Sequence, residues 1–516
     1  MTRHFNTAGP CDAGMHYMLP PLRRLPEAHE LVENQKYFIL HAPRQVGKTT
    51  AFTAYARALT EEGRFSAVLL SMETGAQFSS DVGAAEAAIL DDWQRTIPYR
   101  LPPELRPPPF PAASPGARIG AALERWTAWS PRPLVVFLDE VDSLRDQTLV
   151  SVLRQLRSGY GLHPAGFPWS LALIGLRDVK DYKVSSGERE YLGTASPFNV
   201  KARSLTMRNF TAAEVVELYS QHTAETGQSF TPGAMALAFA LTQGQPWLVN
   251  SLASVMVQEL ARDRSVELTE RHVDQARDVL IVRQETHLDS LAERLREPRI
   301  RGVIEPMLAG APLMDLPPDD VRFAIDLGLV REGASGGLEI SNPIYREIVA
   351  KNLAYTVRLS LPPLQPKWLA ANGGLDREQL LAAFLAFWRR HGEPLFGSTP
   401  YHEVAPHLVM MAFLDRVANG GGSLEREYAV GRGRMDLCLR LGGDVLGIEL
   451  KVWRDGRPDP TAEGLEQLDG YLAGLGLDGG WLVIFDQRGG QPAIEERTTA
   501  EPRRSPGGRE VVVIRA

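Results

Sequence analysis

Lys48 and Thr49 end a polar loop that separates a short apolar run from an Ala-rich helical pattern. The apolar run, Tyr37 to Leu40, predicts a buried strand, and the pattern that continues to Leu59 predicts a helix. In such a loop the backbone N–H groups wrap phosphate oxygens, the lysine reaches the β- and γ-phosphates, and the first threonine hydroxyl holds Mg²⁺. We therefore expect ATP and Mg²⁺ to bind at this loop. The residues that we expect to contact them here are Pro43, Arg44, Gln45, Val46, Gly47, Lys48, Thr49 and Thr50.

The loop fits the P-loop pattern G-x-x-x-x-G-K-[ST] with one departure, because Ala42 stands where the first glycine is usual. The alternative interpretation is a glycine-containing turn before an ordinary helix. The strand before the loop and the helix after it are the context that the motif requires, and they favour the nucleotide site.

A second pair of residues supports hydrolysis. The run Pro133 to Leu138 is continuously apolar, as in a parallel strand buried on both faces, and it ends in Asp139 and Glu140. Adjacent acids at the end of a buried strand are costly unless a cation or a reaction uses them. We expect Asp139 to complete the Mg²⁺ shell and Glu140 to orient or deprotonate the attacking water.

The surrounding pattern alternates strands with helices, which predicts a doubly wound parallel sheet of the α/β class with the phosphates at the carboxyl ends of its strands. Further strands are expected at Ala67 to Met72 and at Ser170 to Gly175, whereas the proline-dense stretch Pro98 to Pro115 predicts an irregular surface insertion. Arg177 follows the last of these strands and is a candidate γ-phosphate sensor. A surface or ion-pair role for Arg177 is the open alternative. The candidates for an arginine finger are Arg177, Arg189 and Arg208.

From Asn209 onward the pattern is helical. Thr211 and Glu214 have the spacing of a capping box, and apolar helices are expected at Pro232 to Thr242 and at Pro246 to Arg262. Such a bundle after a P-loop core commonly serves as a lid over nucleotide. Two short strands around the glycine-rich turn Gly333 to Gly337 then give the outline of a winged helix, which could contact DNA or serve as a packing module.

The C-terminal region contains a second candidate site. Two alternating runs, Met435 to Leu441 and Asp444 to Val452, are joined by two glycines, a strong hairpin signal. A two-residue turn places Asp436 opposite Glu449, with Cβ atoms about 5 Å apart, and Lys451 on the same face. Facing acids repel each other unless a cation lies between them, so we expect Asp436 and Glu449 to hold Mg²⁺ or Mn²⁺. The metal would acidify a water molecule, and Lys451 would position that water or offset the charge of the scissile phosphate. The alternative is an exposed hairpin face with mixed charges.

Residues near this hairpin could support the same chemistry. Gln467 and Tyr471 lie one turn apart on a predicted helix, on a different face from its leucine stripe. Arg432 and Arg434 add positive charge suited to phosphate. Glu403, near the start of another predicted helix, is a further candidate metal ligand, and a surface position for it is equally open.

The motifs Gly433-Arg434-Met435-Asp436, Ile448-Glu449-Leu450-Lys451 and Gln467-x-x-x-Tyr471 resemble the PD-(D/E)XK nuclease superfamily, in particular its RecB-like branch. The resemblance implies that Asp436, Glu449 and Lys451 are catalytic and that Glu403 and Gln467 support them. No proline precedes Asp436, which departs from the pattern. The first half of the chain resembles prokaryotic AAA-like and STAND-related ATPases, some of which carry such a nuclease domain at the C-terminus.

These observations predict the following organisation: an N-terminal approach segment (1–30), a P-loop ATPase core (31–207), a helical lid (208–295), a winged-helix-like region (296–355), a linker and helix (356–392) and a PD-(D/E)XK nuclease-like α/β domain (393–516).

Composition limits the remaining possibilities. The chain of 516 residues has a formal net charge of −7, which argues against a generally basic nucleic-acid coat but leaves room for a local basic groove. With two cysteines, Cys11 and Cys438, we expect neither a disulfide framework nor a cysteine-based zinc site. The sequence has no signal-peptide core and no apolar run of about 18 residues, so we expect a cytoplasmic protein without a membrane partner.

The function predicted from the sequence is an ATPase whose nucleotide state controls a metal-dependent nuclease. We expect the nuclease to act on nucleic acid, with DNA as the favoured substrate, in genome maintenance or defence. A STAND-like switch whose last domain binds nucleic acid or a partner without cleaving it is the alternative. A pure assembly scaffold is disfavoured by Glu140. The sequence also allows the chain to form a homo-oligomer.

Overall fold

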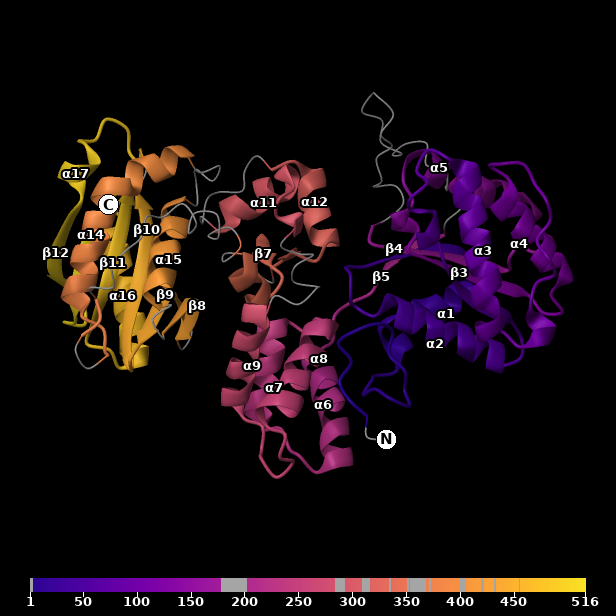
Figure 1. The fold of residues 1–516 in the computed structure, drawn as a ribbon, viewed down its shortest axis with the longest axis horizontal. Coiled ribbons are helices and arrows are strands. Elements are labelled where there is room, and N and C mark those ends of the chain that lie inside the picture. The colour runs from indigo at the N-terminus through magenta and orange to yellow at the C-terminus, as the bar shows by residue number, and fades with distance from the viewer. Residues whose placement is uncertain are drawn as a thin grey trace. The chain divides into compact units, whose positions relative to one another are not determined.

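The computed structural model describes residues 3–177, 202–283, 293–308, 316–333, 336–349, 352, 368–370, 373–398, 405–418, 422–430, 433–453 and 455–516. The chain divides into two compact units, and Figure 1 labels many of the helices and strands of each. The first unit comprises Met1–Asp289 and Pro318–Ile344, and the second comprises Ser290–Pro317 and Tyr345–Ala516. No helix among the described residues is long and apolar enough to cross a bilayer.

The first unit is built on a five-stranded parallel sheet in the order β2-β3-β4-β1-β5. Its strands are β1 (Tyr37–His41), β2 (Ser66–Ser71), β3 (Leu134–Asp139), β4 (Ser170–Gly175) and β5 (Arg203–Thr206). Every residue of β3 and β4 is buried, as their continuous apolar runs predicted. The doubly wound parallel sheet expected from the sequence is therefore confirmed.

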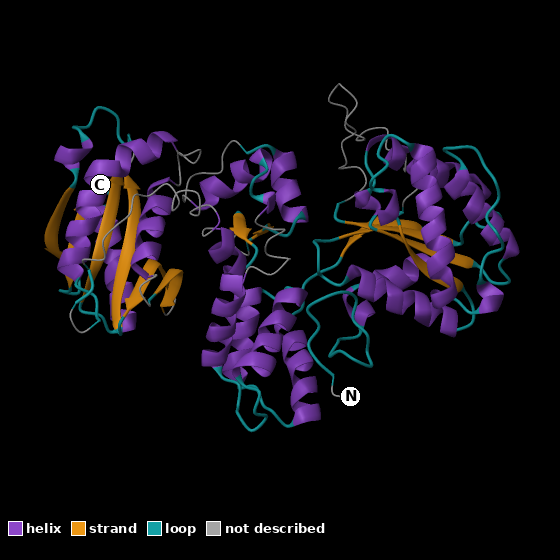
Figure 2. Ribbon diagram, viewed as in Figure 1, coloured by secondary structure: helices purple, strands orange, loops and turns teal. Residues whose placement is uncertain are grey.

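Helices cover both faces of this sheet (Figure 2). Alternate strand residues face one of two apolar cores. One core packs α1 (Pro26–Glu33) and α2 (Lys48–Glu61) against the sheet, and the other packs α3 (Val82–Arg100), α4 (Arg118–Trp129) and α5 (Asp146–Gly159). Short 3-10 turns lie at Pro21–Arg24, Glu73–Gly75, Pro103–Leu105, Val141–Ser143 and Tyr160–Leu162.

The proline-dense stretch differs from the expectation of an irregular surface insertion. Helix α3 continues through Pro98 to Arg100, and a 3-10 turn follows at Pro103–Leu105. Leu101 and Leu105 are buried in the core beneath α3 and α4. Pro98 has no N–H to donate within the helix, and α3 ends two residues after it. The buried side chains of Leu101 and Leu105 hold the following chain against the core.

Four helices follow the sheet: α6 (Ala212–Thr226), α7 (Pro232–Thr242), α8 (Pro246–Val255) and α9 (Glu270–Arg283). The capping box of Thr211 and Glu214 is present with both of its hydrogen bonds. Helix α8 ends earlier than expected and passes into a π-helical turn, Met256–Leu260. The N-terminal segment is ordered against these helices, because Phe5 and Tyr17 are buried and contact the ring of His222.

The first unit also contains α12 (Pro318–Asp326) and the antiparallel pair β6 (Val330–Glu332) and β7 (Leu338–Ile340). The two short strands expected on either side of Gly333 to Gly337 are thus confirmed. The winged-helix interpretation of the whole region 296–355 stays a prediction.

The second unit contains a six-stranded sheet in the order β12-β13-β11-β10-β9-β8. Its strands are β8 (Ser423–Val430), β9 (Gly433–Leu441), β10 (Asp444–Trp453), β11 (Gly479–Asp486), β12 (Thr499–Arg504) and β13 (Glu510–Arg515). β10, β11 and β13 run parallel, while β8, β9 and β12 pair antiparallel with their neighbours. The helices of this unit are α11 (Pro298–Leu308), α14 (Arg377–Ser398), α15 (Ala405–Ala418), α16 (Thr461–Leu475) and α17 (Ile494–Arg497).

Candidate functional site

The loop between β1 and α2 has the backbone of a phosphate-binding loop. Gly47 precedes the first residue of α2 and has φ = 92°, a conformation that a side chain would strain. Lys48 begins the helix, and its ammonium group donates to the carbonyl oxygens of Ala42 and Pro43 at 2.7 and 2.9 Å. Burial lowers the pKa of Lys48 to about 8. The lysine is held inside the loop, where an arriving phosphate would favour its charged form.

Arg24, which the sequence did not single out, contacts this loop from a segment that precedes β1 and stabilises it. Its guanidinium donates to the carbonyl oxygens of Val46 and Arg208 at 2.8 and 3.0 Å, and it lies 4.8 Å from the ring centre of Phe210. Burial lowers the pKa of Arg24 to about 10. No motif marks this residue, because the contacts join segments that are far apart in the sequence.

Thr49 and Asp139 meet at the carboxyl ends of β1 and β3. The Thr49 hydroxyl donates to Oδ2 of Asp139 at 2.7 Å, and Asp139 is only 5% exposed. Burial raises the pKa of Asp139 from its ordinary value. A hydroxyl and a buried carboxylate in contact are the oxygen donors that Mg²⁺ takes beside nucleotide phosphates, so these two residues fit the predicted ion.

Glu140 follows directly and has φ = 58°, in the left-handed region where a non-glycine residue is strained. Partial burial, with a hydrogen bond to the carboxyl group of Glu73, raises the pKa of Glu140 to about 7. Glu73 lies in the turn that follows β2, the strand beside β3. The contact shows a second carboxyl group at the predicted hydrolytic centre, one that the sequence motifs did not indicate.

The three arginines that the sequence singled out lie in different settings. Arg177 pairs with Asp326 at 2.9 Å, and both side chains are 9% exposed. This is the ion-pair role that the sequence left open, and the sensor role stays a prediction. Arg208 pairs with Glu214, the capping residue of α6, at 2.5 Å. Arg189 lies outside the described residues.

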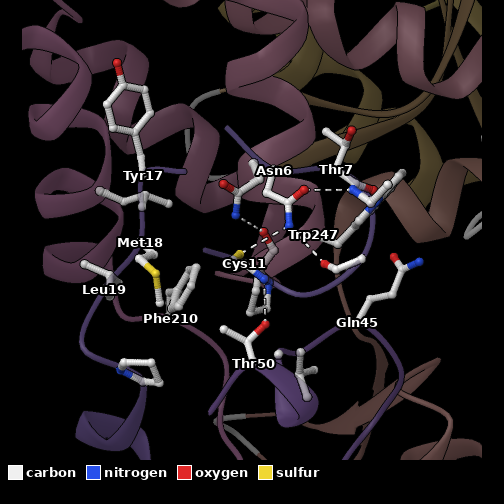
Figure 3. Close-up of a pocket in the computed structure, with 18 of the residues that line it drawn as sticks. Asn6, Thr7, Cys11, Tyr17, Met18, Leu19, Gln45, Thr50, Phe210 and Trp247 are labelled. Carbon is white, nitrogen blue, oxygen red and sulfur yellow. Dashed lines mark hydrogen bonds between the residues drawn. The ribbon is translucent and has the colours of Figure 1, made fainter. Parts of the chain in front are cut away.

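A cavity adjoins the P-loop (Figure 3). The loop contributes Gln45, Val46, Gly47 and Thr50 to its wall, and the N-terminal segment contributes residues from Asn6 to Cys11. The backbone N–H of Cys11 donates to the Thr50 hydroxyl at 3.0 Å. The expected approach segment is therefore part of the candidate nucleotide site.

The hairpin of the second unit has the register that the two-glycine turn predicted. Leu441 pairs with Asp444, and the pairing continues to Leu437 with Ile448, so Asp436 and Glu449 come next. Asp436 accepts a hydrogen bond from the backbone N–H of Leu450 at 2.7 Å. The structure thus brings the two predicted acids to one end of the β9–β10 pair.

Glu449 is buried at 3% exposure, and its Oε1 lies 3.1 Å from the ammonium group of Lys451. Its other oxygen, Oε2, has no hydrogen-bond partner within the part of the chain that the structure describes. Burial, with the nearby charge of Asp436, raises the pKa of Glu449 to about 7. A buried carboxylate oxygen without a partner is costly, and a cation would satisfy it.

Gln467 on α16 accepts a hydrogen bond from Lys451, which links the predicted supporting residue to the hairpin. Glu463 lies 3.8 Å from the same ammonium group. Tyr471, one turn along α16, packs against the apolar core around Leu468. Glu403 lies outside the described residues, and no group of three or more His, Cys, Asp or Glu side chains arranged to hold a metal occurs among the described ones.

No family model and no curated protein matches the chain. Among solved structures, the Walker-type ATPase of Pyrococcus abyssi is similar at 14% identity over 67% of this chain and 99% of that one, with a TM-score of 0.47. The ORC2 protein of Aeropyrum pernix gives 14% identity, 65% and 94% coverage and a TM-score of 0.41. The RuvB Holliday junction branch migration motor of Thermotoga maritima is similar at 15% identity over 64% of this chain and 93% of that one, with a TM-score of 0.35. Similarities at these identities and TM-scores do not establish the activity of this chain.

Proposed function

We propose that the chain is an ATPase whose nucleotide state controls a metal-dependent nuclease in its C-terminal region. The contact of Thr49 with Asp139, beside Glu140, supports the first activity because it joins the Mg²⁺ donors to a carboxyl group placed next to them. Lys48 would bind the β- and γ-phosphates, and Glu140 would accept the proton of the attacking water.

The unpartnered oxygen of Glu449 is the observation that supports the second activity. Asp436 and Glu449 would hold Mg²⁺ or Mn²⁺, and the ion, when bound, supplies an acidified water and neutralises phosphate charge. Lys451, held by Glu449 and Gln467, would orient the water or stabilise charge on the scissile phosphate. Nucleic acid, and DNA in the first place, is the substrate that this site and the nuclease resemblance favour.

The test is cleavage of plasmid and single-stranded DNA by the full chain, with Mg²⁺ or Mn²⁺ and with or without ATP. Glu449→Gln keeps the volume of the buried side chain but removes its charge, so we expect cleavage to be lost while folding is retained. Glu510→Gln changes an exposed acid of the same sheet and is the matched control. Lys48→Ala shows whether cleavage depends on nucleotide.

A switch that does not cleave is the second candidate, and one observation favours it. The ammonium group of Lys451 lies 3.1 Å from Glu449, so a cation of the chain itself already faces the buried carboxylate. In that case ATP is hydrolysed, but the wild-type chain cleaves neither DNA substrate with either metal. The C-terminal region would then serve to bind nucleic acid or a partner.

A further inference from the structure

Lys451 lies within reach of two acids that belong to different elements. On its own strand, Oε1 of Glu449 is 3.1 Å from the ammonium group, and the Glu449 side chain is 4% exposed. On α16, Oε1 of Glu463 is 3.8 Å from the same ammonium group, and this side chain is 67% exposed. The lysine therefore has one buried and one solvent-facing carboxylate beside it.

Gln467 connects the lysine to the outer acid. Its Oε1 accepts a hydrogen bond from the Lys451 ammonium group, and its Nε2 donates to Oε1 of Glu463 at 3.3 Å. An ammonium group can only donate and a carboxylate can only accept, so these two contacts fix which way the amide faces. Glu463 lies one helical turn before Gln467, the spacing at which side chains of a helix meet. The contacts thus run without a break from exposed Glu463 to buried Glu449.

Glu449 has two possible cationic partners, because it is also a proposed ligand of the divalent cation. A carboxylate that binds a divalent cation attracts a neighbouring ammonium group less, since the two positive charges repel each other. This repulsion costs least where the ammonium group has another acid to pair with. Lysine can change partners without a movement of the backbone, because its charge lies at the end of a flexible four-carbon stem.

We propose that Glu463 is a positioning residue of the candidate nuclease site, which holds Lys451, directly and through Gln467, when Glu449 binds a divalent cation. This inference rests on the proposed function and deepens it. Glu463 stabilises the metal-bound state by pairing with the ammonium group that leaves Glu449, and it keeps Lys451 beside the site. Without Glu463, Lys451 stays with Glu449 and opposes metal binding.

The test is Mn²⁺ binding to the full chain without nucleotide or DNA, measured from the free-ion signal in electron paramagnetic resonance. The part of the binding that Glu449→Gln removes belongs to the hairpin. For that part, Glu463→Gln should weaken the Mn²⁺ affinity about 3- to 5-fold, the upper range for a partly exposed ion pair. Glu466→Gln removes another exposed acid from α16 and is the matched control. It should weaken the affinity by less than about 1.5-fold.

A double-mutant cycle with Lys451→Met shows whether Glu463 acts through the lysine. Lys451→Met removes the ammonium group and retains an unbranched side chain. In this background Glu463→Gln should have no more effect than Glu466→Gln, because no ammonium group remains to be held. Lys451→Gln repeats the cycle with a polar replacement, so the test does not depend on the stability of one variant.

Glu449-dependent Mn²⁺ binding of equal strength in the wild type and in Glu463→Gln would overturn the positioning role while leaving the proposed function in place. An effect of Glu463→Gln that persists in the Lys451→Met background would overturn it too, since Glu463 would then act on the metal directly. If Glu449→Gln binds as much Mn²⁺ as the wild type, the hairpin holds no metal, and the proposed nuclease and the positioning role fail together.

Discussion

The role of Glu140 as a base would distinguish an ATPase from a protein that only binds nucleotide. Its position after Asp139 and its hydrogen bond to Glu73 place two carboxyl groups at the edge of the sheet where the P-loop begins. Glu140→Gln should leave ATP affinity within about twofold and lower the hydrolysis rate by 10²-fold or more, as expected for loss of a general base. Phosphate release and equilibrium binding, measured on the same preparation, check this.

The control for Glu140→Gln is Glu124→Gln, which alters an exposed acid on α4. Hydrolysis at the wild-type rate in Glu140→Gln would contradict the role of Glu140 as base. It would favour the scaffold interpretation, in which nucleotide is structural.

Separate measurements of stability and of ATP hydrolysis can distinguish the two roles open to Arg177, the ion pair and the γ-phosphate sensor. Because both side chains of the Arg177–Asp326 pair are buried, Arg177→Ala removes the cation that faces the Asp326 carboxylate and should cost about 3–5 kcal/mol in free energy of unfolding. The pair Arg177→Met with Asp326→Leu should recover much of that loss. Urea unfolding of the full chain measures both. Lost hydrolysis with unchanged stability in Arg177→Ala would instead establish Arg177 as the sensor.

At the scale of the elements, the capping box of helix α6 and an ion pair share one residue, Glu214, which also pairs with Arg208. Arg208 and the backbone N–H of Thr211 hold the pKa of Glu214 at about 2, below its ordinary value of 4.5. A carboxyl group with a lowered folded-state pKa stabilises the fold above the unfolded value, and this contribution disappears as the pH falls through the folded value. The capping box should therefore stabilise α6 fully at neutral pH and lose its effect between pH 4.5 and about 2.

Glu214→Gln should lower the free energy of unfolding by about 1 kcal/mol at pH 7, the usual size of a capping contribution. The difference from wild type should shrink as the pH falls below 4.5. Urea unfolding at a series of pH values measures it, and Glu217→Gln, an exposed acid on the same helix, serves as control. A difference that stays constant to pH 3 would mean that Glu214 acts by packing alone.

Elements with a local signal were predictable, and those without one were not. The β9–β10 hairpin followed from its two glycines, whose φ values of 58° and 91° suit a tight two-residue turn. Strand β12 was missed because Pro502 and its arginines indicate a loop, although an edge strand tolerates proline. Glu73 and Arg24 act through partners distant in sequence, so no spacing rule could find them.

At the scale of the whole molecule, the two candidate sites lie in different compact units. The P-loop, Asp139 and the cavity belong to the first unit, and the hairpin with Glu449 belongs to the second. Control of one site by the other therefore requires a coupling free energy between the units, typically 1–3 kcal/mol where such coupling occurs. The geometry of either site alone does not give this coupling free energy, so it must be measured on the intact chain.

Thermal unfolding of the full chain should measure the coupling. Two units predict two transitions in calorimetry. Mg-ATP at 100 times its Kd should stabilise the first unit by about 2.7 kcal/mol and raise its transition by several degrees. If nucleotide state controls the second unit, the other transition should also move, by the smaller amount set by the coupling. Lys48→Ala should abolish both shifts, whereas Glu449→Gln should leave the first intact. A second transition that ignores Mg-ATP, together with cleavage that is independent of ATP, would show that the chain carries two uncoupled activities.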